Sequence, residues 1–339
     1  MNFSSGRTSE YKPGLSRFCA VPLIFGTCLL YAGGFTTSIE AGMAFLDWPL
    51  SNGSINPDGW LVDPAMRAEH SHRLLGAAVG LLSIVMLVWI WLKEARRWLR
   101  ILAALNLVSV IAQGLVGGLR VRLDHLNTGI ANEETTFALL ITHSLGAQIV
   151  ICIMIAIAVA NSRAWIEATD RWKQTVGPAV RLWGLAATGT ILAQIFIGAI
   201  MRHADAGLAI PTFPHAQPKG GFIPVDWNWA VAINFSHRIG AVLTVIVVLA
   251  FVAQIWAQPG ARRPLGLLAV VPTALLALQV CLGAIATWTL LNAHAATLHL
   301  LIGAFLLASC WMLTFLSFRI PTPDNNRSMP SVSDNTAKT

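Results

Sequence analysis

The chain is 339 residues long, and 55% of these residues are hydrophobic whereas only 12% are charged. Soluble globular domains carry about a quarter charged residues, so this composition excludes an ordinary soluble protein. The formal net charge of +7 would suit nucleic-acid binding, but the basic residues lie in short segments between long apolar runs. We therefore expect a membrane protein whose basic residues set its topology, and no nucleic-acid partner.

Eight apolar runs follow one another, and each is near or above the roughly 20 residues that a helix needs to cross a bilayer. The first follows a basic N-terminal segment and could be a cleaved signal peptide, but no small-residue cleavage pattern follows it. We expect a membrane helix there, and hence an all-α integral membrane protein with eight transmembrane helices in the lipid bilayer. The expected helices cover residues 19–37, 70–92, 101–119, 135–160, 182–202, 229–256, 264–290 and 294–318.

The distribution of basic residues predicts the orientation. Sixteen of the 23 Lys and Arg residues fall on the cytoplasmic side if the N-terminus is cytoplasmic, which is the expected bias. The sequence therefore predicts a multi-pass protein of the bacterial inner (plasma) membrane with both termini in the cytoplasm. We divide it into a cytoplasmic N-terminal segment (1–17), an N-terminal four-helix bundle (18–161), a cytoplasmic linker (162–181), a C-terminal four-helix bundle (182–318) and a disordered cytoplasmic tail (319–339).

An internal repeat organises the apolar runs. The segment from Gly33 to Trp48-Pro49 recurs 165 residues later as Gly198 to Phe213-Pro214. The same offset relates Glu69-x-x-His72-Arg73 to Asn234-x-x-His237-Arg238, and offsets of 166 and 156 relate Gln113 to Gln279 and His143 to His299. Four segments repeated in the same order predict two pseudo-symmetric four-helix bundles related by an axis along the membrane normal. Small residues in the repeat, which suit close helix contacts in lipid, are Gly117, Gly118, Gly198 and Gly283.

The shorter last offset leaves about ten extra residues in the first half, around residues 120–136, and the sequence assigns them no role.

Four histidines lie at repeat-matched places in the apolar helices: His72, His143, His237 and His299. An ionisable side chain at this depth is costly and usually faces the bundle interior. Two imidazoles on facing helices are a common way to hold haem iron. A lone histidine is equally explained by a hydrogen bond between helices. Zinc is less suited, because each half supplies two histidines and no paired cysteines, and no Cys-x-x-Cys-His motif indicates covalent haem attachment.

Arg73 and Arg238 directly follow their histidines. Each guanidinium could pair with a haem propionate, because it binds carboxylates through two parallel hydrogen bonds. Snorkelling to the membrane surface explains either arginine equally well. Of the other histidines, His70 points to the opposite helix face, His125, His203 and His215 are expected in outer loops, and His294 at the interface.

The two halves differ beside the first histidine of each pair. Glu69 stands three residues before His72, on the same helix face, whereas Asn234 occupies the matched place before His237. A carboxylate beside one site can steady positive charge or move protons, so we expect chemistry in the first half and electron transfer in the second. The alternative is a first-turn acid that the helix dipole favours.

At these residues the chain resembles the haem A synthase family. The resemblance covers about residues 18–318 and depends on Glu69-x-x-His72-Arg73, His237-Arg238, His143, His299 and the segments Ala41-Gly42-Met43-Ala44…Asp47-Trp48-Pro49 and Ala206-Gly207-Leu208-Ala209. It implies that His237 and His299 ligate a b-type haem, that His72 and His143 address the substrate haem O, and that Glu69 is catalytic. The implied product is haem A, formed by oxidising the C8 methyl of haem O to a formyl group through two successive hydroxylations.

The resemblance also implies partners. These are haem O synthase, cytochrome oxidase subunit I or its assembly factors, and an electron acceptor or donor that the sequence does not identify; a homo-oligomer is compatible with it. Two departures from the family pattern stand out. Thr37 lies where many members have an arginine, although Arg202 occupies the matched place in the second half, and the outer-loop cysteines of one branch are absent because all five cysteines lie in apolar runs.

Two rival functions remain open from the residues alone. A di-haem b-type cytochrome that carries electrons from quinol would use the four histidines but leave Glu69 without a role. A haem-handling chaperone or transporter could use outer-loop tryptophans as a platform, although such residues are typical of an interfacial aromatic belt: Trp48, Trp60, Trp227 and Trp229.

Overall fold

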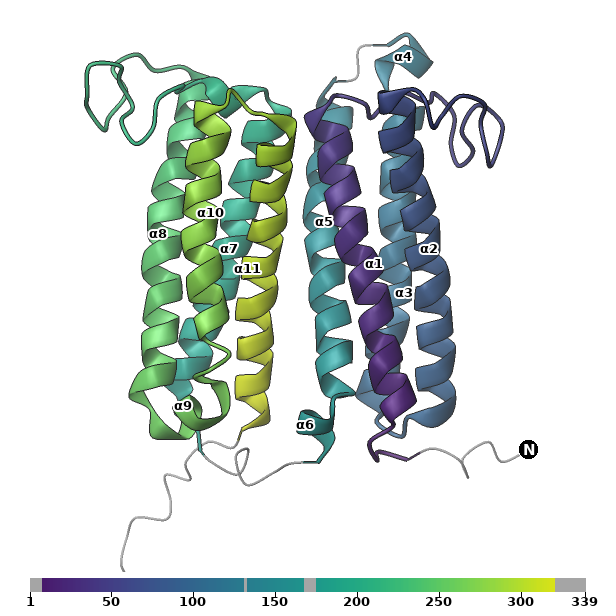
Figure 1. Ribbon diagram of the computed structural model, residues 1–339, viewed down its shortest axis with the longest axis vertical. Coiled ribbons are helices and arrows are strands. Elements are labelled where there is room, and N and C mark those ends of the chain that lie inside the picture. Colours follow the sequence, from purple (N-terminus) through teal and green to yellow (C-terminus); the bar gives the residue numbers. More distant parts are fainter. Residues whose placement is uncertain (1–7, 131–132, 168–174, 321–339) are drawn as a thin grey trace, which may run out of the picture.

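The computed structural model describes residues 8–130, 133–167 and 175–320. This part of the chain is helical, with isolated bridges but no strand (Figure 1). Eight of its helices are long and apolar enough to cross a membrane, as the sequence predicts. Most of the expected tail (319–339) and part of the expected linker (162–181) lie outside the described residues; Arg319, expected in the disordered tail, ends the last long helix instead.

The first four long helices contact one another in a ring, and short helices follow two of them. Their bounds are α1 (Pro13–Ser38), α2 (Pro64–Lys93), α3 (Arg97–Arg122) and α5 (Glu133–Ala160), with the short α4 (His125–Thr128) and α6 (Arg163–Ile166).

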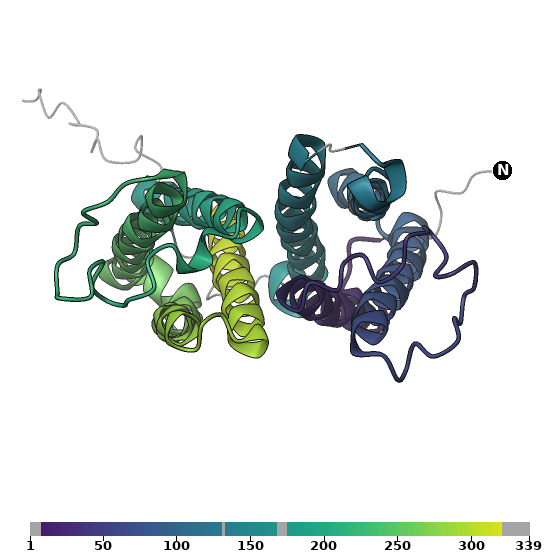
Figure 2. The same ribbon diagram turned by 90° about the horizontal axis from the view of Figure 1, so that it is seen from above.

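The last four long helices form a second ring. Their bounds are α7 (Pro178–His203), α8 (Trp229–Ala257), α10 (Val270–Trp288) and α11 (Ala293–Arg319), with the short η2 (Ala206–Leu208) and α9 (Pro259–Leu265). Figure 2 shows the two groups side by side. The axis that would relate them stays a prediction.

Seven of the eight expected spans lie within the observed helices. The exception is 264–290, because Pro264 belongs to the separate helix α9 and residues 266–269 form a turn before α10 begins. At the other end of this expected span, Leu290 and Leu291 adopt positive φ angles of 51° and 61°. A right-handed α-helix requires negative φ angles, so the helix cannot include these two residues.

Proline and side-chain caps fix where several helices begin. Pro13, Pro64 and Pro178 stand in the first turns of α1, α2 and α7, where a missing N–H costs nothing. Asp63 and Asn228 accept hydrogen bonds from backbone N–H groups in the first turns of α2 and α8.

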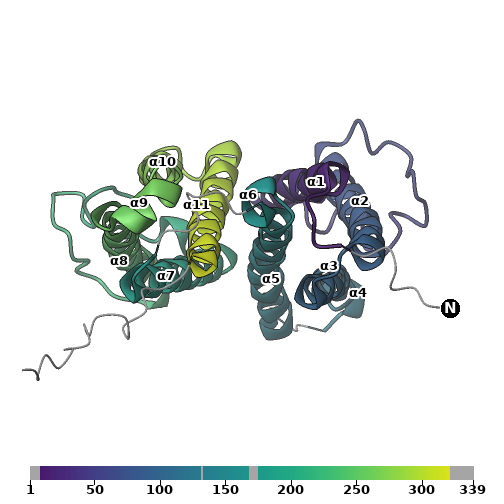
Figure 3. The same ribbon diagram turned by 90° about the horizontal axis from the view of Figure 1, so that it is seen from below.

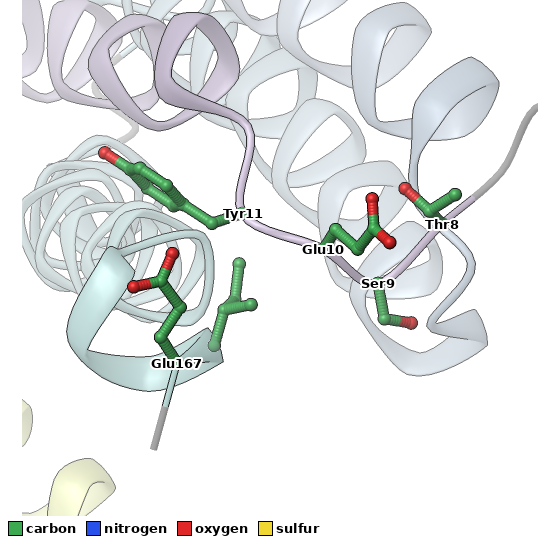
Figure 4. Close-up of a pocket in the computed structure, with 6 residues that line it drawn as sticks. Thr8, Ser9, Glu10, Tyr11 and Glu167 are labelled. Carbon is green, nitrogen blue, oxygen red and sulfur yellow. The ribbon is translucent and has the colours of Figure 1, made fainter. Parts of the chain in front are cut away.

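The two ends of the molecule differ. The long segments 39–63 and 204–228 lie at one end, which we call the loop end, and the described N-terminal residues, α6 and α9 lie at the other, the terminal end (Figure 1). A hollow at the terminal end is lined by Thr8, Ser9, Glu10, Tyr11, Ile166 and Glu167 (Figure 4).

The halves meet along α1 and α5 on one side and α7 and α11 on the other (Figure 3). The most apolar stretches of α11 and α5 are 56% and 44% buried, against 17–22% for the other six, so these two helices form the centre of the molecule. Trp311 of α11 donates to the carbonyl of Cys152 in α5 (2.8 Å), and Ser38 of α1 bonds Thr297 of α11 (2.9 Å). These contacts bring the two expected sites toward one interface.

A buried ion pair closes the terminal end of the first half. The carboxylate of Glu94, directly after α2, accepts hydrogen bonds of 2.9 and 2.8 Å from the Arg96 guanidinium, which also donates to the carbonyl of Ala160 in α5. Burial raises the pKa of Glu94, but the hydrogen bonds and charge of Arg96 outweigh this, so the pKa lies below its ordinary value.

We expect Glu94→Gln to lower the free energy of unfolding at neutral pH by about 1–3 kcal/mol, because a charged hydrogen-bond acceptor is replaced by a neutral one. Since the folded pKa is depressed, this contribution exists above the unfolded pKa of about 4.3 and is lost as the pH falls through the folded pKa. Thermal unfolding in detergent between pH 7 and pH 3 should show a gap between wild type and variant that closes on acidification. A gap that is absent at pH 7, or independent of pH, would contradict the prediction.

Candidate functional site

The structure brings together the two expected histidines of the first half. His72 lies on α2 and His143 on α5, both toward the loop end, and their ring centroids are 6.3 Å apart with the rings at 87°. Both rings are partly buried between the helices.

The second half repeats this arrangement. His237 on α8 and His299 on α11 have ring centroids 6.4 Å apart, with the rings at 70°. The repeat therefore identified each partner, because the matched histidines pair within their own bundle and in the same way.

This spacing fits one metal ion between each pair. Metal–imidazole bonds are about 2 Å long and the ring centre lies roughly 1 Å further, so two imidazoles on opposite sides of one ion have centres about 6 Å apart. Within the described residues, no group of three or more His, Cys, Asp or Glu side chains is arranged to hold a metal. Two-ligand sites with open positions suit the iron of a porphyrin, which supplies its own equatorial ligands.

A glycine on a neighbouring helix makes room for each imidazole. A Cβ atom added to Gly33 would lie 2.7 Å from Cε1 of His72, and one added to Gly198 would lie 2.9 Å from Cε1 of His237. The matched glycines of the second histidines, Gly117 and Gly283, would bring a Cβ to 3.2 and 3.1 Å from Cε1 of His143 and His299. The sequence predicts close contacts at these small residues; the structure shows that the histidine rings fill them.

Glutamines hold the rings of the second half. Nδ1 of His299 donates to the carbonyl of Gln279 (3.1 Å), which leaves Nε2 as an acceptor that the Gln279 amide approaches at 3.3 Å. The Gln194 amide lies 3.0 Å from Nδ1 of His237 and donates to the carbonyl of the same residue. Iron ligation through Nε2 of His237 therefore requires Gln194 to release Nδ1.

In the first half, Nδ1 of His72 and Nδ1 of His143 are both buried without a hydrogen-bond partner among the described residues. The backbone groups of Leu29 and Gln113 still act on these two rings, and Gln113 matches Gln279 in the repeat, so both halves place a glutamine beside the second histidine.

Glu69 and Arg73 anchor the first long loop over the His72–His143 pair. Glu69 is 4% exposed, accepts from the backbone N–H of Phe45 (3.0 Å) and pairs with Arg73 at 2.5 Å. Arg73 also donates to the carbonyls of Phe45, Asp47 and Leu50. Most of the Arg73 donors that could grip a propionate are therefore already engaged.

The second half has the same architecture without the charge pair. Asn234 donates to the carbonyls of Ala206 and Gly207, and its own carbonyl accepts from Arg238 at 3.1 Å. Arg238 reaches the carbonyls of Ile210 and His215. The Asn234 amide thus holds the second long loop as the Glu69 carboxylate holds the first. Holding the loop in place therefore does not by itself require a charged side chain at position 69.

Asp47 stabilises the tip of the first loop. Burial opposes its ionisation, but hydrogen bonds from the N–H groups of Gly53 (2.7 Å) and Asn52 (2.8 Å) and the charge of Arg73 prevail, so its pKa lies below the ordinary value.

Arg120 near the end of α3 is a site residue that the sequence reading placed only within the extra segment 120–136. It donates to the carbonyl of Gly42 in the first loop, its Nη2 lies 3.9 Å from Asp124, and its buried Nε has no partner among the described residues. Its charge acts on both Glu69 and His143. One signal could have identified it: Arg120 follows Gly117 by three residues, whereas Ala286 follows the matched Gly283.

His203 corrects the expectation for the outer loops, and Arg202 beside it joins the two halves. His203 is not in a loop but is the last residue of α7, where its Nε2 lies 3.4 Å from the hydroxyl of Ser144, next to His143. Arg202 crosses to the first half and donates to Gly34 and Ser38 of α1, each at 2.7 Å. Helix α7 therefore extends beyond its apolar run to include these two polar residues, because their side chains face the other bundle rather than water.

The remaining histidines lie outside the pairs. His70 contacts Ser51 and the Trp60 ring, so it anchors the loop on the helix face away from His72. His125 begins the short helix α4 rather than lying in an irregular loop, because Asp124 caps that turn. His215 lies in the second long loop, as expected, and His294 bonds the Tyr31 hydroxyl at 3.2 Å.

The four outer tryptophans do not share one surface role. Trp48 packs against Gly118 of α3 and Trp60 bonds Asn56, whereas Trp227 and Trp229 are 54% and 66% exposed.

Comparison with known proteins gives one family. The family described as Cytochrome oxidase assembly protein matches residues 17–311. The Heme A synthase of Symbiobacterium thermophilum is 32% identical over 280 residues, 79% of this chain and 83% of that protein. Those of Geobacillus kaustophilus and Caulobacter vibrioides are each 26% identical, over 80% and 93% of this chain and 81% and 100% of their own lengths. The resemblance that the motifs indicate is confirmed over nearly the whole membrane part.

We expect Gly33→Ala to destabilise the protein by about 1–3 kcal/mol, because the new methyl group must displace the His72 ring. Gly80→Ala is the matched control: it also lies inside a long helix, but an added Cβ there meets nothing within 4 Å. That variant should be as stable as the wild type or slightly more stable. Thermal unfolding in detergent measures both; equal effects would mean that the Gly33–His72 contact does not constrain the packing.

Proposed function

This chain belongs to the Cytochrome oxidase assembly protein family, and we propose that it is a haem A synthase, an oxidoreductase that converts haem O to haem A. The observation that carries the proposal is the combination of two equally spaced histidine pairs with a single carboxylate, Glu69, beside only one of them. Relatives named Heme A synthase that align along most of the chain support it.

We assign the first half to the substrate. His72 and His143 would hold the iron of haem O, and the loop that Glu69 and Arg73 anchor would cover that site from the loop end. Two axial ligands and a covering loop would hold the macrocycle in one orientation, and such positioning of the reacting group is a main benefit of binding.

We assign the second half to a resident b-type haem, held by His237 and His299. When bound, such a haem supplies reversible one-electron transfer. Asn234 in place of a carboxylate, and the Gln279 carbonyl that orients His299 through Nδ1, suit a site that keeps its ligand rather than transforms it. The amides of Gln194 and Gln279 would have to move off Nδ1 of His237 and Nε2 of His299 when iron binds.

Glu69 is the proposed catalytic base. It stands one turn nearer the loop end than His72 and it is buried, and one of its oxygens accepts from the Phe45 backbone alone among the described residues. Each of the two successive hydroxylations of the C8 methyl would add an oxygen atom from water and release two protons and two electrons, and loss of water from the hydrated product would leave the formyl group. A carboxylate there can take up the released protons. The released electrons would pass through the second half to an acceptor outside the chain.

Arg73 and Arg238 stay proposed contacts for the haem propionates. Each would have to exchange one of its loop carbonyls for a carboxylate oxygen, a stronger acceptor. Their loop contacts would then respond to haem binding.

We propose that the loop end faces outward and that both termini are cytoplasmic, following the basic residues. Haem O synthase would deliver the substrate, and cytochrome oxidase subunit I or its assembly factors would receive haem A. The name of the matching family, Cytochrome oxidase assembly protein, supports a connection to the oxidase.

The near-identical spacing of the two histidine pairs also suits a non-catalytic di-haem cytochrome. Mass identification of each porphyrin in the purified protein separates the two functions. Formyl-haem that appears when haem O is supplied supports the enzyme, and b haem alone in both halves supports the cytochrome.

We expect Glu69→Gln to keep its bound haem but to lose at least 99% of haem A formation, because the amide can still accept from Phe45 but cannot take a proton. Haem content from absorption spectra and product from mass analysis measure the two effects separately. Asp58→Asn, which makes the same kind of change at an exposed acid of the first loop, should leave haem A formation unchanged. Undiminished haem A in Glu69→Gln would exclude Glu69 from the mechanism.

We expect His237→Ala and His299→Ala each to remove the low-spin b-type spectrum, because each takes away one of the two axial ligands. The matched substitutions His72→Ala and His143→Ala should keep that spectrum and lose haem O binding instead. If the b-type spectrum survives both changes in the second half, the assignment of ligands is wrong.

A further inference from the structure

Arg120 lies directly beside the proposed substrate site, toward the loop end. Gly117, one turn earlier on α3, makes room for the His143 ring, and residues three apart share a helix face. A rise of about 1.5 Å per residue puts Arg120 roughly 4.5 Å nearer the loop end than that contact. Its guanidinium reaches the Gly42 carbonyl in the first long loop, and its charge acts on His143, so it lies on the loop-end side of that histidine.

The charge of Arg120 is only loosely paired. The side chain is 20% exposed, and its ion pair with Asp124, the one that it forms within the described residues, is 3.9 Å long, beyond hydrogen-bond distance. Asp124 is itself engaged in capping α4 through the N–H of Leu126. Glu69, the other acid on which Arg120 acts, is already paired with Arg73.

The donors of Arg120 are also incompletely used. One Nη1 hydrogen goes to the carbonyl of Gly42, and the buried Nε has no partner within the described residues. A guanidinium has five N–H donors, and leaving them unmatched in a buried place is costly unless a ligand completes them. The arginines after the histidines differ, because their donors already bind loop carbonyls.

The second half lacks this residue. The matched position after Gly283 is Ala286, which is 7% exposed. Arg238 and Arg202 act on the histidines of the second pair, so Arg120 is a further cation that only the first half places on this face of its third helix.

We propose that Arg120 is a substrate-binding residue that pairs with a propionate of haem O. This inference rests on the proposed function, because it takes the first half as the haem O site. Because the Arg120 guanidinium also donates to the Gly42 carbonyl, it would contact the bound propionate and the first long loop at the same time. Substrate binding would in this way be coupled to the position of the loop.

The test measures binding rather than turnover. Haem O and its dimethyl ester, in which both propionates are masked, are titrated into the purified full-length protein that carries its resident haem, with the dissociation constant taken from the absorption change. Wild type should bind haem O at least tenfold more tightly than the ester. Arg120→Gln should lose about tenfold in affinity for haem O and bind the ester as wild type does.

Arg122→Gln is the matched control, because Arg122 is exposed at the same end of α3; it should keep the wild-type preference for haem O. Arg120→Lys, which keeps the charge without the forked geometry, should retain part of the preference and serves if Arg120→Gln does not fold.

Equal preference in wild type and both Arg120 variants would overturn the inference, and so would a wild type that does not distinguish haem O from its ester. A wild-type protein that binds neither compound would instead overturn the proposed function, and this inference with it.

Discussion

The packing of imidazole rings against helix backbones is the constraint on which the rest of this structure depends. Each ring of a pair fills the space that a glycine leaves on a neighbouring helix, and the centroids come to 6.3 and 6.4 Å. Because a histidine at this depth is costly, the bundle must give it a fixed place and a partner. Once helix spacing is set by these contacts, the distance between facing rings follows, and it is the distance that a single iron ion would bridge.

The long loops depend on the same helices. Glu69 and Arg73 extend from the first turns of α2 to backbone groups of the first loop, and Asn234 and Arg238 do so for the second. The residues that flank the histidines thus hold the loops above them. A ligand that moved these residues would therefore move the loops as well. Arg120 adds a third contact of this kind in the first half alone.

The halves share a framework and differ in charge. Glu69 and Arg120 stand beside the first pair, where the second half has Asn234 and Ala286. Arg202 is a charged residue that the two halves share: it belongs to the second half, but its guanidinium donates to Gly34 and Ser38 of the first. A repeated bundle therefore keeps one arrangement of paired imidazoles while a few polar substitutions change the charge beside one pair, and this difference is the basis for proposing chemistry in one half and electron transfer in the other.

The sequence by itself determined the eight helices, the pairing of the four histidines and the difference between Glu69 and Asn234, because hydropathy and a repeat offset are read along the chain. The break before α10 was missed, since Pro264 and Gly266 interrupt a run that remains apolar. Only the tertiary structure decided that His203 lies within α7 and beside Ser144, that Arg202 crosses between halves, and that Arg120 contacts Gly42, 78 residues away. Such contacts depend on how helices rotate and where loops return, and neither is encoded in the local periodicity of any one segment.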